Sequence, residues 1–399
     1  MKLLQINVTA NWGSTGKIAE DIGKLAIEAG WESWIAYGRG NPSSASNLIR
    51  IGSDWDMKLH GLQTRIFDNH GLASKKATKE FIQKVKEIQP DIIHLHNIHG
   101  YYINYYLLFE FLKEYGRPVV WTLHDCWTFT GHCSHFVFAR CDKWKSGCFD
   151  CPEKGSYPKS LIIDRSRQNY IDKKNAFLGL RNLTIVPVSN WLSEMVSKSF
   201  FKGYPINTIH NGIDLSVFNS QGSNSQTEKG YYRILGVASV WNDRKGLADF
   251  IHLRSLLPKN YEIVLVGLTQ DQIDSLPSGI RGITRTENIQ QMVDLYASAD
   301  VFVNPTLEDT FPTTNIEALA CGTPVVTYRT GGSPEAIDVN TGVVVPYGSV
   351  MDLAEAVKKV CENREHYRPF CRERAEKYFD CNKQYKKYIE LYESVSSVR

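Results

Sequence analysis

The sequence predicts an α/β protein made of two doubly wound domains, each with a parallel sheet between layers of helices. Short apolar runs alternate with longer segments that have the apolar spacing of amphipathic helices. The runs are almost continuously apolar, as strands buried on both faces of a parallel sheet require. This strand–helix alternation is typical of βαβ units and occurs in both halves of the 399 residues.

The first half contains five expected strands and three expected helices. The strands are residues 3–8, 33–37, 91–96, 118–123 and 184–188, and the helices are residues 16–29, 79–89 and 106–115. We place an N-terminal Rossmann-like domain at residues 1–195. A cysteine-rich insertion, residues 126–160, interrupts this domain, and a final helix, residues 382–399, is expected to join it.

The second half repeats the pattern and defines a second Rossmann-like domain, residues 196–381. Its expected strands are residues 233–238, 262–266, 301–304, 324–327 and 343–345, and its expected helices are residues 246–256, 289–298, 315–320 and 351–361. Residues 220–230 lack apolar side chains, and this polar composition predicts a flexible surface loop. Two such domains facing one another form an interdomain cleft, with an anionic nucleotide expected at the carboxyl ends of the strands.

The composition excludes several classes of protein. Apolar residues make up 42% and charged residues 22%, which argues against disorder and against a disulfide-stapled miniprotein. The net charge is +3, so no concentrated basic face for nucleic acid is expected. The apolar part of residues 1–10 is too short for a signal peptide, and no run approaches the roughly 18 apolar residues of a membrane span. We therefore expect a cytoplasmic protein.

A glycine-containing motif, Asn-Trp-Gly-Ser-Thr-Gly-Lys, follows the first expected strand and opens the first helix. Gly13 and Gly16 allow a tight turn, and the free N–H groups of a helix start, near Ser14, favour a phosphate. The spacing matches neither a P-loop nor a dinucleotide fingerprint. A plain strand-to-helix turn is an equally good interpretation.

An acidic motif follows the expected strand 301–304. Asp309 lies in a loop, and Glu317 lies eight positions later in a short helix. Two carboxylates directed into one cleft can bind vicinal hydroxyls, such as those of a sugar and a ribose. Taken singly, each residue is better explained in another way, Asp309 as a helix cap and Glu317 as a solvated side chain.

Several motifs together resemble the retaining glycosyltransferases of family 4. Residues 309–317 are similar to the family's E-x7-E signature, and residues 211–214 with Phe218 resemble its NGID…F turn. Arg244-Lys245-Gly246 resembles the segment whose lysine binds the donor diphosphate, and residues 331–335 resemble a GG-x-PE turn. The resemblance covers nearly the whole chain. It implies the GT-B fold of two facing Rossmann-like domains.

The resemblance implies roles for individual donor-side residues. Glu317 matches the glutamate that binds the ribose, and Asp309 matches the one that contacts hydroxyls of the donor sugar. Because aspartate is one methylene shorter, Glu308 is an alternative for that position. The remaining donor-binding assignments are Gly13, Ser14, Gly16, Arg244, Lys245, Thr313 and Thr314.

His124, at the end of the expected strand 118–123, matches a family histidine that touches donor sugar or acceptor, and a titratable imidazole could polarise a hydroxyl there. His94 and His96, which share a face of the preceding strand, are more simply explained as buried structural residues. We expect transfer without a catalytic metal or other cofactor, because Lys245, Arg244 and the amides of helix N-termini can stabilise the charge on the departing diphosphate. The family mechanism needs no covalent nucleophile, and none is assigned.

The cysteines crowd into the insertion. Cys133, Cys141, Cys148 and Cys151 end in a C-x2-C pair, and four thiolates can hold a structural zinc ion. Residues 136–149 are expected to form little hydrophobic core of their own, and a structural zinc ion would explain how such a segment is ordered. Reduced thiols without a metal are an equally good interpretation, because the longer spacings are not those of a standard zinc finger.

The sequence thus predicts a glycosyltransferase that moves a sugar from a nucleoside-diphosphate sugar to a saccharide or lipid-linked saccharide in surface polysaccharide synthesis. A sugar-nucleotide 2-epimerase of the same fold is the first alternative, and a non-enzymatic, zinc-containing partner-binding protein is the second. Aromatic residues 101–106, with Lys75, Lys76 and Lys79, could provide peripheral membrane contact. Packing at a helix start is the simpler explanation of these aromatics.

Overall fold

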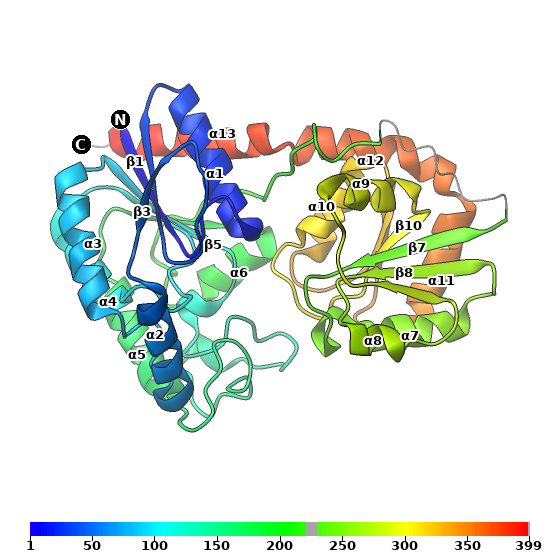
Figure 1. Cartoon of the computed structure of the whole chain (residues 1–399), viewed down its shortest axis with the longest axis horizontal. Helices are drawn as coiled ribbons and strands as arrows, with labels where there is room; N and C mark the ends of the chain where they lie inside the picture. Colours follow the sequence, from blue (N-terminus) through cyan, green and yellow to red (C-terminus); the bar gives the residue numbers. More distant parts are fainter. Residues whose placement is uncertain (221–229, 398–399) are drawn as a thin grey trace. The chain divides into compact units, whose positions relative to one another are not determined.

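The computed structural model describes residues 1–220 and 230–397 and divides the chain into two compact units (Figure 1). Unit 1 comprises Met1–His210 and Tyr385–Arg399, and unit 2 comprises Asn211–Gln384. The division falls after His210, whereas the boundary expected at residue 195 lies inside helix α6 (Asn190–Lys198). Most of the expected loop 220–230, and the last two residues of the expected final helix, lie outside the described residues.

The sheet of unit 1 has six strands, paired in parallel, in the order β3-β2-β1-β4-β5-β6. The strands are β1 (Lys2–Asn7), β2 (Glu32–Tyr37), β3 (Asn47–Arg50), β4 (Ile92–Leu95), β5 (Val119–Leu123) and β6 (Leu183–Pro187). Every residue of β4, β5 and β6 is buried, as expected for strands covered on both faces.

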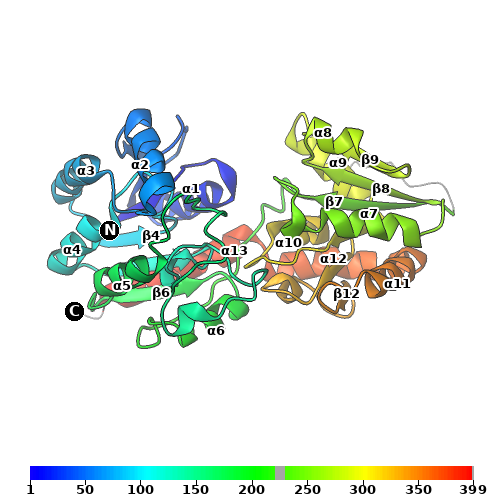
Figure 2. The ribbon, with the colours of Figure 1, turned by 90° about the horizontal axis from the view of Figure 1, so that it is seen from below.

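Helices cover both faces of this sheet. They are α1 (Gly13–Glu28), α2 (Asp54–Phe67), α3 (Lys75–Ile88), α4 (Tyr105–Tyr115), α5 (Ser166–Phe177), α6, and α13 (Cys381–Ser397), with the short 3-10 turns η1 (Trp127–Phe129) and η2 (Lys143–Lys145). Figure 2 shows α3, α4 and α5 in a row along one side of unit 1. The end of α13 packs on the sheet through Tyr392, whose hydroxyl lies 2.6 Å from Nδ1 of His94.

The sheet of unit 2 also has six parallel strands, in the order β12-β11-β10-β7-β8-β9. The strands are β7 (Tyr232–Val237), β8 (Tyr261–Val266), β9 (Ile280–Ile283), β10 (Val301–Asn304), β11 (Val325–Tyr328) and β12 (Gly342–Val345). The helices are η3 (Asp243–Lys245), α7 (Leu247–Leu256), α8 (Gln270–Asp274), α9 (Ile289–Ser298), α10 (Thr313–Ala320), η4 (Ser333–Ala336), α11 (Val350–Glu362) and α12 (Arg364–Tyr378). Helices α7 and α11 pack together on one face, and α9, α10 and α12 cover the other (Figure 1).

The strand order positions the functional loops. In each unit the chain starts with a central strand, builds outward on one side and then crosses to the other side. The direction reverses between β1 and β4 in unit 1, and between β7 and β10 in unit 2. Ligands of doubly wound sheets bind outside the carboxyl ends of the strands at such switch points. The predicted fold class is confirmed, and the residues between Ser239 and Lys245 and between Pro305 and Pro312 stand at the switch point of unit 2.

Candidate functional site

Three loops meet at the carboxyl end of the sheet in unit 2, and backbone contacts fix them to one another. The Leu307 N–H donates to the Arg244 carbonyl at 2.7 Å, which ties the β10 loop to the β7 loop. The Gly332 N–H donates to the Asp309 carbonyl at 3.2 Å, which ties the β11 loop to the β10 loop. Gly331 is required here, because a Cβ on it would lie 1.7 Å from the Asp309 carbonyl oxygen.

Two ion pairs connect the β7 loop to the acidic loop after β10. Arg244 Nη1 lies 3.2 Å from Glu308 Oε1, and Lys245 Nζ lies 2.6 Å from Asp309 Oδ2. The Glu308 side chain is almost completely buried, whereas that of Asp309 keeps 18% of its surface exposed. The structure therefore brings the four predicted charged residues into one cluster and gives each carboxylate its own cation.

Glu317, in α10, lies beside a tyrosine that the sequence analysis did not find. The Tyr296 hydroxyl donates to Glu317 Oε2 at 2.8 Å, and the Thr313 side chain also hydrogen-bonds to this carboxylate. Burial raises the pKa of Glu317, although these two hydrogen bonds oppose the rise. Tyr296 could not be predicted because it lies 21 residues earlier, on α9, with no pattern that links the two.

The start of α10 presents two hydroxyl side chains. Pro312 is the N-cap, and Thr313 and Thr314 form the first turn, both half-buried. Backbone N–H groups in a first helical turn have no partner within the helix, so they favour an anion or a hydroxyl oxygen there. Both threonines therefore lie at a helix start that can receive an anionic or hydroxylated ligand.

The glycine motif in unit 1 forms a tight turn between β1 and α1. The Asn11 N–H donates to the Gly16 carbonyl at 2.9 Å, and Gly13 has a φ of 67°. A Cβ on Gly16 would lie 2.6 Å from the Thr9 hydroxyl, so the turn packs too closely for any larger residue. Ser14 is exposed at the first turn of α1.

A chain of hydrogen bonds holds His124. The Gln5 amide donates to the Ala19 carbonyl at 2.7 Å, so its Oε1 faces Nε2 of His96 at 3.0 Å. An amide oxygen only accepts, so His96 Nε2 carries a hydrogen. Burial holds the pKa of His96 well below its ordinary value, so Nδ1 of this neutral ring accepts from His124 Nε2 at 3.2 Å. Burial also lowers the pKa of His124, to about 4, and this ring is therefore neutral near pH 7.

A histidine–carboxylate pair, His99 with Asp125, lies beside His124, and the sequence analysis did not find it. His99 Nε2 is 2.9 Å from Asp125 Oδ2, and the Trp127 N–H donates to Asp125 Oδ1 at 2.9 Å. Burial alone would raise the pKa of Asp125, but its interactions with His99 and the Trp127 N–H lower it to about 2. The loops after β4 and β5 thus join a neutral imidazole, a second histidine and a carboxylate at one edge of the sheet.

The four predicted zinc ligands, Cys133, Cys141, Cys148 and Cys151, line one small pocket. The Gly131 N–H donates to Cys148 Sγ at 3.1 Å. A hydrogen bond with Cys133 lowers the pKa of Cys151 to about 7. Nevertheless, across residues 1–220 and 230–397 no group of three or more His, Cys, Asp or Glu side chains could hold a metal ion. The prediction of a structural zinc is not supported.

The insertion has the core that the sequence analysis did not expect. Trp144 and Phe136 are buried, and their rings stack with centroids 4.9 Å apart. Phe129 contacts Trp144 edge-on at 5.3 Å. Aromatic packing of this kind can order a loop-rich segment without a metal.

Most residues of the aromatic run 101–106 are buried. Tyr102 and Tyr105 are buried, with 1% and 0% of their surface exposed. The Tyr102 hydroxyl donates to the Asn97 carbonyl, and the Tyr105 ring packs against Trp127 and Phe177. Most of this run is core, which agrees with the simpler explanation of packing at a helix start, and peripheral membrane contact stays an untested prediction. Within residues 1–220 and 230–397, no helix is both long and apolar enough to cross a membrane.

Comparison with known proteins identifies the family of this chain. Residues 19–217 match the model described as "Glycosyltransferase Family 4", and residues 232–363 match the one described as "Glycosyl transferases group 1". The chain belongs to glycosyltransferase family 4. The predictions of a GT-B fold and of a retaining, metal-independent glycosyltransferase that uses a nucleotide-sugar donor are thereby confirmed.

Individual relatives agree with the family. The chain is 24% identical over 383 residues, 90% of each protein, to the putative colanic acid biosynthesis glycosyl transferase WcaC of Escherichia coli. The fold is similar to that of sucrose-phosphate synthase from Thermosynechococcus elongatus, with a TM-score of 0.73 and 16% identity over all of both chains. It is also similar to Anabaena HepE in complex with UDP-glucose, with a TM-score of 0.65 and 16% identity over 99% of this chain and all of the other.

Proposed function

We propose that this glycosyltransferase extends a saccharide acceptor during synthesis of a surface polysaccharide. The support is the similarity to WcaC, named for colanic acid biosynthesis, along 90% of both chains. The acceptor is a free or lipid-linked saccharide. The nine cysteines are free thiols, which fits the reducing cytoplasm as the place of action.

The observation that carries the donor proposal is the paired charge cluster at the β7–β10 switch point. Departure of a nucleoside diphosphate concentrates negative charge on its phosphates, and cations fixed in place lower the energy of that transition state. We assign this task to Lys245 and Arg244. Asp309 and Glu308 hold the two side chains in place before the donor binds.

Asp309 is the residue we assign to the donor sugar, and Glu308 the residue that fixes Arg244. The Asp309 carboxylate retains exposed surface and can accept hydrogen bonds from sugar hydroxyls while it contacts Lys245. Glu308 is buried and turned toward Arg244, which leaves it little access to a ligand. The burial of the two side chains thus favours Asp309 for the first acidic position of the family signature.

Glu317 is assigned to the ribose diol of the nucleotide. Its Oε2 accepts from Tyr296, which orients the carboxylate, and an ionised carboxylate has further lone pairs for two vicinal hydroxyls. Thr313 and Thr314, with the N–H groups of the same helix start, are assigned to the phosphates. Gly13, Ser14 and Gly16, in the turn before α1, are likewise assigned to the donor, as the family resemblance implies.

Retention at the anomeric carbon follows from attack on the face that the diphosphate leaves. The acceptor hydroxyl forms the new glycosidic bond as the bond to the diphosphate breaks, and a departing phosphate oxygen takes the hydroxyl proton. We assign to His124 the positioning of a hydroxyl of the donor sugar or acceptor. With its pKa at about 4, it does so as a neutral hydrogen-bonding group and contributes no positive charge.

The test is turnover of a panel of sugar nucleotides by the purified chain, with and without saccharide acceptors. Glu317→Gln should reduce transfer at least 100-fold. Glu262→Gln is the matched control, because Glu262 is an ion-paired carboxylate in the same unit, on β8, outside the switch-point loops. Full activity of Glu317→Gln would overturn the residue assignment. A donor converted to its C2 epimer without any acceptor would overturn the transfer reaction in favour of the epimerase.

A further inference from the structure

The hydrogen bonds that hold His124 begin in the core of unit 1. Gln5, on β1, and His96, directly after β4, are 0% and 1% exposed, whereas His124, directly after β5, is half-buried. The three side chains meet because β4 pairs with both β1 and β5. They form a relay, Gln5–His96–His124, that leads from a buried amide to an imidazole at the carboxyl edge of the sheet.

The direction of each hydrogen bond in the relay is fixed at its buried end. The Gln5 amide nitrogen donates to the Ala19 carbonyl at 2.7 Å, and a carbonyl only accepts. Exchanging the nitrogen and oxygen of this amide would place two acceptors together and lose a buried hydrogen bond. The Gln5 oxygen therefore faces His96, whose Nε2 must carry a hydrogen to donate across 3.0 Å.

The His96 ring carries that one hydrogen and no second one. Burial holds its pKa well below the ordinary value, and the two titratable neighbours that act on it, His94 and His124, also oppose protonation. The His94 ring lies against it with centroids 3.9 Å apart, and Tyr392 and Thr122 hold His94 in place through hydrogen bonds. Nδ1 of His96 therefore has a lone pair, which accepts from Nε2 of His124 at 3.2 Å.

The same reasoning fixes the hydrogen of His124. Burial lowers its pKa to about 4, although the charge of Asp125 opposes this change, so the ring holds one hydrogen near pH 7. That hydrogen is on Nε2, because Nε2 donates to His96. Nδ1 of His124 has a lone pair and no hydrogen, so it can only accept a hydrogen bond. The relay thus selects one of the two neutral forms that a histidine can adopt.

We propose that Gln5 and His96 are positioning residues for sugar transfer, which keep Nδ1 of His124 free of hydrogen so that it accepts from a hydroxyl of the substrate. The proposal rests on the assignment of His124 in the proposed function, and it names the chemical class of the group bound there. A hydroxyl or an ammonium group can donate to Nδ1. A carboxylate, an ether or a fluorine atom cannot, and places its own lone pairs against that of Nδ1.

The buried relay should select a donating group more sharply than an exposed histidine does. A histidine in water can move its hydrogen to the other ring nitrogen and then bind an accepting group. In this chain the same move would turn the lone pair of His96 Nε2 toward the Gln5 oxygen. The loss of one such buried hydrogen bond corresponds to about tenfold or more in an equilibrium constant.

The hydrogen positions can be measured by nuclear magnetic resonance on the full chain with isotope-labelled histidine. Nitrogen–proton correlation spectra distinguish a ring nitrogen that carries hydrogen from one with a lone pair, and His124→Gln identifies the His124 signals. We expect the hydrogen on Nε2 of His124 in the parent. Gln5→Met should move it to Nδ1 in about half of the molecules or more, because His96 then avoids a buried N–H without an acceptor.

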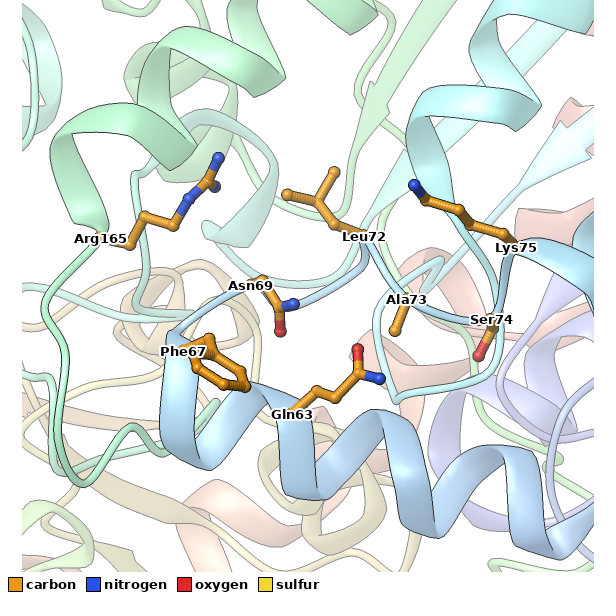
Figure 3. A pocket seen from close by; sticks show the side chains of 8 residues that line it. All are labelled: Gln63, Phe67, Asn69, Leu72, Ala73, Ser74, Lys75 and Arg165. Carbon is orange, nitrogen blue, oxygen red and sulfur yellow. The ribbon is translucent and has the colours of Figure 1, made fainter.

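Gln63→Met is the matched control, because it is the same substitution at another place in unit 1. Gln63 is exposed on α2, and its side chain lines a hollow of 630 Å³ between the end of α2 and the start of α3 (Figure 3). No residue of the relay lines that hollow. The control should keep the parent's histidine spectrum and transfer rate. A parent with hydrogen on Nδ1 of His124, or a Gln5→Met variant with the parent's spectrum, would overturn the proposal.

Substrate analogues test the selection of a donating group in the parent chain, so the proposal can be tested even if Gln5→Met does not fold. Donor and acceptor sugars that have one hydroxyl replaced by fluorine, or by an ammonium group, are compared position by position. His124→Ala identifies the contacted hydroxyl as the position where the replacement no longer matters. There the parent should use the ammonium analogue about tenfold better than the fluorinated one or more, and Gln5→Met should bring the ratio close to one.

The outcomes separate this proposal from the proposed function on which it rests. Equal use of the two analogues by the parent, or the parent's ratio in a folded Gln5→Met variant, would overturn the selection of a donating group. Full transfer by His124→Ala would instead overturn the role of His124 in the proposed function, whatever the position of its hydrogen. The thermal unfolding midpoint of each variant separates a lost fold from a changed selection.

Discussion

The ammonium group of Lys245 lies 2.6 Å from the carboxylate of Asp309, and the two residues follow the two strands, β7 and β10, between which the sheet reverses direction. The pair therefore stands where a doubly wound sheet accepts an anionic ligand. The lysine has a partner in the free chain, so its side chain is ordered before a diphosphate arrives, and catalysis needs little reorganisation at this point.

We expect Lys245→Ala to lower the rate of sugar transfer on the order of 10²- to 10³-fold, the usual loss when one fixed charge is removed from a developing anion. The effect should fall on kcat as well as on KM, because the diphosphate charge is largest in the transition state. Lys358→Ala is the control, since Lys358 forms an ion pair with Glu355 on a surface helix of the same unit. Equal losses in the two variants would contradict the assignment.

Asp309 and Glu308 should respond differently to loss of charge. Asp309→Asn should reduce transfer at least tenfold with little change in stability, because Asp309 faces the ligand side. Glu308→Gln should instead lower the free energy of unfolding by about 1–3 kcal/mol, since it weakens the buried contact with Arg244. Steady-state kinetics and urea unfolding separate the two effects. The reverse pattern would assign Glu308 to the donor sugar.

Tyr296→Phe tests the tyrosine beside Glu317 through the pH dependence of transfer. The tyrosine hydrogen bond opposes the rise in pKa that burial imposes on Glu317, so its loss should raise that pKa further. Because the ionised carboxylate is the form proposed to bind ribose, the acidic limb of the kcat/KM profile should move to higher pH. Tyr328→Phe, which loses a hydrogen bond to Asp249, is the control and should leave the limb in place.

His60 gives a prediction about acid stability. The Gly71 N–H donates to His60 Nε2 at 3.0 Å, so the folded chain favours the neutral ring, and burial lowers the pKa from 6.5 to about 4. In the unfolded chain His60 binds a proton below about pH 6.5, whereas in the folded chain it stays neutral until the pH falls to about 4. This site alone should therefore cost about 3 kcal/mol of stability as the pH falls between those values.

His60→Gln should make the dependence of unfolding free energy on pH shallower by about one proton over this range. Urea unfolding at pH 7, 6, 5 and 4.5 measures the slopes. The exposed His252→Gln variant provides the control and should keep the parent slope. Identical slopes for the parent chain and His60→Gln would show that His60 does not titrate as its burial requires.

The core of the fold could be read from the sequence because parallel strands buried on both faces are apolar throughout. Edge strands β3 and β9 were missed, since their sequences, Asn-Leu-Ile-Arg and Ile-Arg-Gly-Ile, mix polar and apolar residues. Helices α2, α5, α6, α8 and α12 were also missed. In α2 the large apolar residues Trp55, Leu59 and Leu62 are exposed. The residues that face the core are His60, Gly61 and Thr64, so the sequence shows no apolar stripe on the buried side of this helix.

The candidate site, like the fold, could be predicted from the sequence only in part. Arg244, Lys245, Glu308 and Asp309 could be named because they lie in two short motifs, and the structure places them together, although their roles stay predictions. Tyr296 with Glu317, and Gln5 with His96, could not be found. Gln5 and His96 are 91 residues apart and meet only because β1 and β4 are neighbours in the sheet.

Gly246 tests whether the β7 loop must approach β10 closely. It has a φ of 74°, and an added Cβ would lie 2.4 Å from the Pro305 carbonyl oxygen. Gly322 has nearly the same φ, 77°, but nothing within 4 Å of its added Cβ. Gly322→Ala should cost about 1 kcal/mol of unfolding free energy for backbone strain alone, and Gly246→Ala about 2–4 kcal/mol. Gly246→Ala should also lower transfer at least tenfold, because the loop that carries Lys245 must shift. Equal costs in urea unfolding would show that the close approach to Pro305 does not constrain this loop.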